Sequence, residues 1–137
     1  MANKKQPEKN KKTTTKKKNV VKITSSGKAM ITSTYNNTVI SLTNSSGDVI
    51  CWSTPGLVGF TGARASTPYA ATIAAEDAGK KALEKGLQSV EVVTKGPGVA
   101  KISAVKGIKS SGLKISSIKD VTPLPHNGCR SRKQRRM

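Results

Sequence analysis

The chain has 137 residues, enough for one domain with a modest core but too few for a second domain that folds alone. Its formal net charge is +18, from 25 Lys and Arg against 7 Asp and Glu, so we expect a polyanionic partner. Cys51 and Cys129 make no disulfide framework, and His126 with Cys129 does not close a zinc site, so no cofactor or metal is expected. The chain has no apolar stretch of membrane-spanning length and no secretory signal, which predicts a soluble protein of a reducing compartment.

The positive charge is concentrated at the two ends of the chain. Residues 1–18 carry a net +7 and residues 130–137 a net +5, which leaves +6 for the 111 residues between them. Neither end has enough apolar residues to fold alone, so we expect both to be disordered in isolation and to bind phosphate. An anionic membrane is the rival partner, but neither end has the bulky apolar residues of a membrane-binding basic helix. A third interpretation is that these charges contact only solvent. It is disfavoured, because repulsion between so many like charges would oppose the compact state.

The first structured part of the chain, residues 27–56, predicts three strands in a meander, because apolar and polar residues alternate with period two. Asn36 and Asn37 make the first tight connection, since asparagine tolerates left-handed backbone angles. Gly47 supplies the positive φ of the second connection. Trp52 lies in the middle of the third strand and is expected in the core.

A glycine-rich loop at 57–66 follows and leads into a helix that begins at Thr67, its N-cap, with proline in the first turn. The helix is expected to run to about Lys85 and to stop at Gly86. An alanine stripe should lie on the sheet, and acid–lysine pairs four residues apart should lie on the other side as surface charges. The stripe is Ala71, Ala75, Ala78 and Ala82, and the pairs are Glu76–Lys80 and Asp77–Lys81.

The last part of the chain predicts a strand at 87–96, a glycine–proline–glycine turn at 96–98, a helix at 99–110 and a strand at 113–122. The order βββαβαβ predicts an α/β fold, a mixed five-stranded sheet with packed helices. We therefore divide the chain into a basic N-terminal arm at 1–19, a single α/β domain at 20–122 and an extended basic C-terminal tail at 123–137.

The same order occurs in the ribonuclease H-like fold, so nuclease activity has to be considered. Nucleases of this fold hold two metal ions with several carboxylates that converge from strands and a helix. Only Asp48, Glu91 and Asp120 lie on or beside predicted strands, and the first strand has no acid. We therefore expect no enzyme activity and no catalytic or metal site.

Four short motifs carry a resemblance to a known family: YNNT (35–38), GFTGARASTPYAA (59–71), KGPG (95–98) and DVTPLPHNGCR (120–130). In this order and spacing they closely resemble the ribosomal small-subunit protein eleven family, over about residues 28–130. The resemblance implies an inactive ribonuclease H-like fold and a structural role in the small ribosomal subunit, bound to the central domain of its ribosomal RNA. It also implies a place on the platform beside the messenger RNA exit path, near small-subunit proteins seven, eighteen and twenty-one.

The chain departs from the family pattern at three places. Residues 99–102 replace a second Pro-Gly and an Arg-Glu, so Lys101 offers one point charge in place of a bidentate contact. Thr61 and Ala65 stand where family members tend to have basic residues, and the usual prolines after Arg130 are missing. These departures weaken the case for RNA contacts at the loop and the turn more than at the tail.

Several residues are candidates for RNA contact. Arg64, with Ser66 and Thr67, precedes a helix N-terminus and is interpreted as a phosphate site in preference to a simple cap. The two adjacent asparagines and the glycines of the turn either contact RNA or only form turns, and both interpretations stay open. The predicted RNA-binding set is Asn36, Asn37, Arg64, Ser66, Thr67, Gly96, Gly98, Lys101, His126, Asn127, Gly128, Arg130, Arg132, Lys133, Arg135 and Arg136.

The tail itself combines two prolines, a turn and a basic end. Pro123 and Pro125 keep the chain extended, residues 126–128 turn it, and the basic end is expected to lie along RNA. Asn127 precedes Gly128, a pair prone to form isoaspartate, and we predict isoaspartate there in assembled subunits, with ordinary ageing damage as the alternative.

The alternative function is a general architectural nucleic-acid-binding protein. Without a transit peptide at its start, the chain is expected in the cytoplasmic ribosome of a bacterium, an organellar ribosome being the alternative.

Overall fold

A computed structural model describes residues 24–130 and 132–134, and the predicted arm at 1–19 lies outside them. The elements are β1 (Ser26–Ser33), β2 (Thr38–Asn44), β3 (Val49–Ser53), the 3-10 helices η1 (Pro55–Val58) and η2 (Gly62–Ser66), α1 (Pro68–Glu84), β4 (Ser89–Lys95), α2 (Lys101–Ser110) and β5 (Lys114–Asp120). The predicted order βββαβαβ is confirmed. The glycine-rich loop is more regular than predicted, because it contains the two 3-10 helices.

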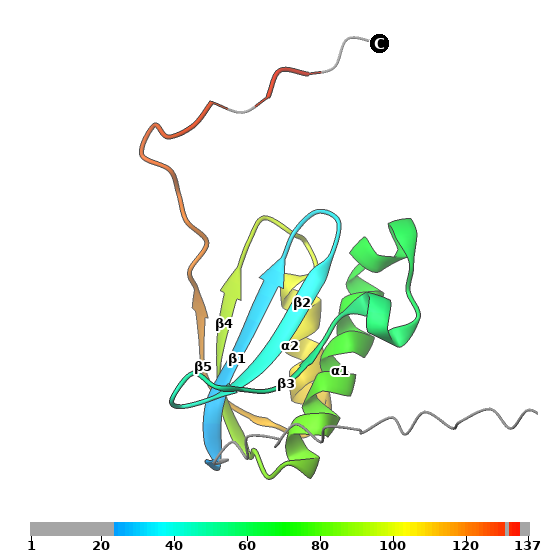
Figure 1. Ribbon diagram of the computed structural model, residues 1–137, viewed down its shortest axis with the longest axis vertical. Helices are drawn as coiled ribbons and strands as arrows, with labels where there is room; N and C mark the ends of the chain where they lie inside the picture. The colour runs from blue at the N-terminus through cyan, green and yellow to red at the C-terminus, as the bar shows by residue number, and fades with distance from the viewer. Residues whose placement is uncertain (1–23, 131, 135–137) are drawn as a thin grey trace, which may run out of the picture.

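The five strands form one mixed sheet in the order β3-β2-β1-β4-β5, as predicted. β1 pairs antiparallel with β2 and β2 with β3, whereas β1 with β4 and β4 with β5 are parallel. Parallel neighbours need a crossover, and each of the two helices supplies one. Both helices lie against the same face of the sheet, and the opposite face is open (Figure 1). This topology fits the ribonuclease H-like order.

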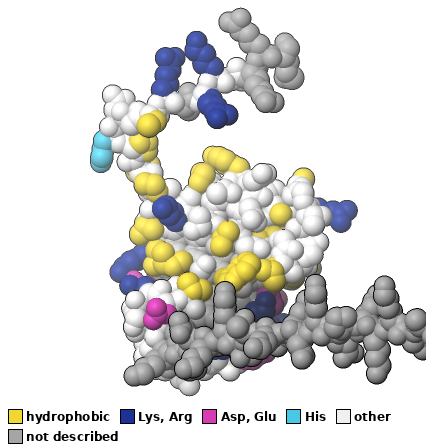
Figure 2. Space-filling model, viewed as in Figure 1, with side chains coloured by type: hydrophobic (Ala, Val, Ile, Leu, Met, Phe, Trp, Pro, Cys, Tyr) yellow, Lys and Arg dark blue, Asp and Glu magenta, His cyan; other side chains and the backbone are white. Residues whose placement is uncertain are grey.

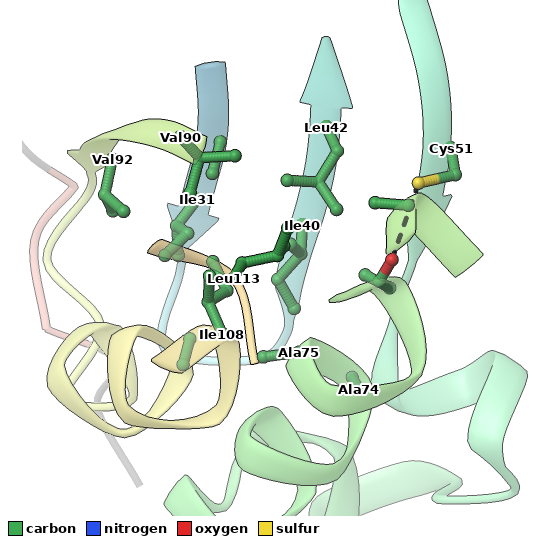
Figure 3. Packing of buried hydrophobic residues seen from close by; sticks show 14 of the residues in the cluster. Ile31, Ile40, Leu42, Cys51, Ala74, Ala75, Val90, Val92, Ile108 and Leu113 are labelled. Carbon is green, nitrogen blue, oxygen red and sulfur yellow. Dashed lines mark hydrogen bonds between the residues drawn. The ribbon is translucent and has the colours of Figure 1, made fainter. Parts of the chain in front are cut away.

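The core lies between the sheet and the two helices (Figure 3). Ile31, Ile40 and Val92 point from neighbouring strands toward the helices and are fully buried. The predicted alanine stripe of α1 is buried as well, which lets the helix lie close to the sheet. A Cβ on Gly107 of α2 would come within 2.5 Å of the carbonyl oxygen of Thr72, so glycine is what allows α2 to approach α1.

Helix α1 begins and ends as predicted. The Thr67 side chain accepts a hydrogen bond from the backbone N–H of Ala70, and Gly86, with a φ of 94°, follows the last turn. One of the two predicted acid–lysine pairs is an ion pair, in which Nζ of Lys81 lies 2.5 Å from Oδ2 of Asp77. Asp77 also accepts a hydrogen bond from the Ser53 hydroxyl at 2.7 Å, so this acid faces β3 and is not a plain surface charge.

Trp52 is not in the core, and this prediction was wrong. Trp52 is 52% exposed, while its two neighbours on the strand, Cys51 and Ser53, are buried. Trp52 pairs in register with Ser41, and both lie on the open face of the sheet. A strand with only one covered face alternates inward and outward residues, and position 52 falls on the outward set despite its size.

Candidate nucleic-acid interface

The loops that carry the predicted RNA-binding residues lie at one end of the sheet. β1, β3, β4 and β5 all run in the same direction, because β3 is antiparallel to β2 and β2 to β1. The segments that follow these four strands therefore start from the same end, and Figure 1 shows them together there. They are the β1–β2 turn, the η1–η2 segment with the start of α1, the 96–98 turn and the C-terminal tail. The fold thus gathers segments that are far apart in sequence.

The β1–β2 turn is closed by a threonine hydroxyl. Thr34 Oγ1 accepts hydrogen bonds from the backbone N–H groups of Asn36 (3.3 Å) and Asn37 (3.0 Å). Neither asparagine has a positive φ, so the prediction of left-handed angles here was wrong. Asn37 Oδ1 accepts a hydrogen bond from the N–H of Thr38 at 2.9 Å and is used within the fold. The exposed Asn36 carboxamide makes no hydrogen bond to any residue that the structure describes, so it is the asparagine available to a partner.

Arg64 lies in η2 and is exposed to solvent. None of the acids in the described part of the chain forms an ion pair with it. The two neighbouring hydroxyls are already engaged, since Ser66 donates to the Ala63 carbonyl (2.8 Å) and Thr67 donates to the Arg64 carbonyl (2.8 Å). Ser66 and Thr67 therefore fix the junction between η2 and α1, and the Arg64 guanidinium is the group left to bind an anion.

The glycines of the 96–98 turn allow that turn to approach β1. Gly96 has a φ of 108°, and a Cβ there would lie 2.1 Å from the carbonyl oxygen of Ser33. A Cβ on Gly98 would lie 2.1 Å from the Ser33 hydroxyl oxygen. The Gly98 N–H donates a hydrogen bond to the Ser33 carbonyl at 3.0 Å. The close approach that these glycines permit is therefore a contact within the protein.

Lys101 is part of a polar cluster at the root of the tail. Its Nζ lies 2.8 Å from Oδ2 of Asp120, so its charge has an internal partner. The hydroxyl of Thr122 donates to the same carboxylate and accepts a hydrogen bond from the Gly96 N–H at 3.1 Å. The hydrogen bond from Lys101, followed by those from Thr122, lowers the pKa of Asp120 to about 2. The cluster fastens the start of the tail to the 96–98 turn.

Sequence reasoning missed Asp120 and Thr122 as anchors of the tail. The signal was present in the motif Asp-x-Thr before a proline, because an aspartate can bond the backbone N–H two residues ahead. The N–H of Thr122 does donate to Oδ1 of Asp120 at 2.9 Å.

Beyond Thr122, the described residues of the tail form no helix or strand. All residues at 123–130 and 132–134 are exposed, and the chain bends at His126 and Asn127, where Asn127 has a φ of 57°. Arg130, Arg132 and Lys133 have no ion-pair partner in the part of the chain that is described. Figure 2 shows basic side chains of the tail standing clear of the domain. Arg135 and Arg136 lie outside the described residues.

The remaining strand acid has a lysine partner. Glu91 lies 2.8 Å from Nζ of Lys119, and the hydrogen bond from this lysine lowers the pKa of the Glu91 carboxyl. Within the described ranges, no three His, Cys, Asp or Glu side chains gather as metal ligands would. No helix found there is both long and apolar enough to cross a membrane.

Comparison with known proteins gives the family. The family model for Ribosomal protein S11 matches residues 27–136. The Small ribosomal subunit protein uS11 of Christiangramia forsetii is 50% identical over 128 residues, which cover 93% of this chain and 96% of that protein. The protein of the same name from Flavobacterium johnsoniae is 52% identical over 126 residues, covering 92% of this chain and 98% of that protein. The chain therefore belongs to the ribosomal protein S11 family.

Proposed function

We propose that the protein is held on small-subunit ribosomal RNA by its C-terminal tail, with the loops at the same end of the sheet as secondary contacts. As a member of its family, it is a structural constituent of the small ribosomal subunit and not an enzyme. The observation that carries the proposal is the run of exposed tail cations without an internal partner in the described residues. Five Arg or Lys in residues 130–137 would each neutralise a backbone phosphate.

The division of roles follows from which groups the fold already uses. Arg64 can grip a phosphate with two N–H groups, and Asn36 can offer its amide to a base edge or sugar. His126, Asn127 and Gly128 redirect the chain, so that the cations after them can follow an RNA surface. Lys101, Ser66, Thr67, Gly96 and Gly98 act within the protein and position these contacts. Recognition then depends on phosphate, sugar and the shape of folded RNA.

The motifs quoted above support a more specific location. We propose contact with the central domain of the ribosomal RNA and a place on the platform beside the messenger RNA exit path. Small-subunit proteins seven, eighteen and twenty-one would be the protein neighbours. We propose the cytoplasmic ribosome of a bacterium as its location, with an organellar ribosome as the alternative. The bacterial origin of both relatives supports this proposal.

Two measurements test this function. Tagged full-length protein should sediment with the small ribosomal subunit, and ultraviolet cross-links from the tail should map to the central domain of the ribosomal RNA. Sedimentation with bulk DNA would instead favour a general architectural nucleic-acid-binding protein. Cross-links confined to another RNA domain would contradict the proposed location.

A further inference from the structure

The two edge strands of the sheet differ in how well they are covered. On β3, Ile50 and Cys51 are buried, the Ser53 hydroxyl bonds to Asp77 of α1, and the Cys51 thiol lies 3.5 Å from the carbonyl oxygen of Ala78 (Figure 3). On β5, every residue is exposed except Ile115, which is half-buried. An uncovered edge strand presents unpaired N–H and C=O groups and is a template for a further strand.

A β-bulge directs two isoleucines of β5 toward the helix side of the sheet. Ile115 is in register with the buried Val90 and Ile118 with the buried Val92, although the two isoleucines are three residues apart. The register shift between these pairs makes this possible, since strict alternation would put them on opposite faces. Helix α2 lies over β1 and β4, so this side of β5 is left open and Ile118 is 60% exposed.

The open side of β5 and helix α2 enclose a groove. It has a volume of about 690 Å³ and continues into an adjoining hollow of about 430 Å³ next to Asp120. Val105, Ile115 and Ile118 give it an apolar floor, and Ile102 stands 69% exposed beside the hollow. Apolar side chains in such a groove gain stability when a partner removes them from water.

The rim of the groove is positively charged. Lys106, Lys109 and Lys114 line it and are exposed, and none of them has an ion-pair partner within the described ranges. The acid that borders it, Asp120, is paired with Lys101. The groove therefore combines an apolar floor, an open strand edge and an uncompensated positive rim.

We propose that this groove binds an extended acidic segment of a neighbouring protein in the small subunit, which pairs with β5 as a sixth strand. Its apolar residues would contact Ile118 and Val105, and its acidic residues would lie beside Lys106 and Lys109. The proposal rests on the proposed function, because it is the ribosome that supplies the neighbour.

Two other occupants fit the groove less well. RNA phosphates would find lysines there, but they would gain nothing from the apolar floor of Val105, Ile115 and Ile118, which favours a partner with apolar side chains. The chain's own first 18 residues carry a net +7, so the lysine rim would repel them.

The first test is a site-specific cross-link. Full-length protein carrying p-benzoylphenylalanine in place of Ile118 is assembled into small subunits, irradiated and analysed by mass spectrometry. A matched variant carries the same group in place of Val49, which is 53% exposed on the opposite edge strand. We expect position 118, but not position 49, to cross-link to a protein segment rich in Asp and Glu that alternate with apolar residues. A cross-link to RNA alone, to a basic segment or to no molecule at all would overturn the proposal.

The second test reverses charge on the rim. Replacing Lys106→Glu and Lys109→Glu in the cross-linking variant should lower the yield of the protein cross-link roughly three- to tenfold, since two attractive contacts become repulsive. Lys80→Glu with Lys95→Glu makes the same change of net charge at two exposed positions that line neither the groove nor its adjoining hollow and should leave the yield unchanged. Equal losses in both double variants would contradict recognition at the rim.

Sedimentation separates a failure of this inference from a failure of the proposed function. If the protein enters small subunits and position 118 gives no acidic cross-link, the groove is not the docking site and the ribosomal role stands. If the protein does not enter small subunits, the ribosomal role fails first and the inference fails with it.

Discussion

The α/β domain and the C-terminal tail obtain their structure from different sources. In the domain, Ile31, Ile40 and Val92 are fully buried between sheet and helices, and the buried side-chain polar atoms that are described all have hydrogen-bond partners. In the tail, all residues at 123–130 are exposed, and Leu124 reaches 83% exposure. The domain is thus stabilised by its own contacts, whereas the described residues of the tail have no such packing.

The two regions meet at a small polar cluster. Lys101, Asp120 and Thr122 join the end of β5 to the 96–98 turn through hydrogen bonds and an ion pair. We therefore expect core substitutions to change the free energy of unfolding, and loop and tail substitutions to change RNA binding.

The largest effect is expected in the core. Ile40→Ala should lower the free energy of unfolding by about 2–5 kcal/mol, because it leaves a cavity in a fully packed region. The matched tail variant, Leu124→Ala, should change it by less than about 0.5 kcal/mol. Chemical denaturation of both variants measures the difference. Similar losses would mean that the tail packs on the domain.

A smaller effect is expected on RNA binding at the loops. Arg64→Ala should weaken binding to the central-domain RNA by about 1–3 kcal/mol, the range for a charged hydrogen bond. Lys101→Ala should weaken it less, because Asp120 already neutralises that lysine. Titration of both variants against the same transcript provides the comparison, and equal losses would refute the ranking.

The root of the tail gives a pH-dependent prediction. Folding lowers the pKa of Asp120 from 3.8 to about 2, so its contribution to stability is present above pH 4 and is lost as the pH falls toward 2. The chemical shift of the Asp120 carboxyl carbon, followed by NMR against pH, should report a titration midpoint near 2 in the native protein. In Lys101→Met the midpoint should rise toward the ordinary aspartate value, because the hydrogen bond from Lys101, the largest cause of the lowered pKa, is lost. An unchanged midpoint would show that Lys101 does not hold this carboxylate.

The smallest structural change is expected at Asn127. The amide nitrogen of Gly128 can attack the Asn127 side-chain carbonyl carbon with loss of ammonia, and water then opens the succinimide to aspartate or isoaspartate. Glycine does not shield its nitrogen, and the pair lies in the exposed bend of the tail. We predict a sizeable isoaspartate fraction in fresh subunits, measured by peptide mapping with an isoaspartate-specific methyltransferase. The same low level in fresh free protein and in subunits would leave Asn127 as a turn residue.

The helices and strands of the domain were predicted well from sequence, because the local sequence signals agree with the packing that the structure shows. The alanine stripe, the Thr67 cap and Gly86 fixed the limits of α1, and alternation located the strands. Trp52 was misplaced because alternation does not tell which face of a strand is covered until the helices are placed.

The site was predicted in part. The positions of Asn36, Arg64 and the tail at one end of the sheet follow from strand directions, but side-chain pairing does not. The pairing of Lys101 with Asp120, 19 residues away, depends on tertiary structure, and so do the groove at β5 and the bulge that shapes it.

We propose that the tail cations hold the protein on RNA while the domain positions them. The most direct measurement is the salt dependence of binding to the central-domain RNA, for the full chain and for a chain lacking residues 130–137. Removing five phosphate contacts should reduce the slope of log affinity against log salt by roughly 4, or somewhat less if the contacted RNA is single-stranded. Replacing the same five residues with glutamine should have the same effect at unchanged length. An unchanged slope in both variants would show that the tail cations do not hold the protein on RNA.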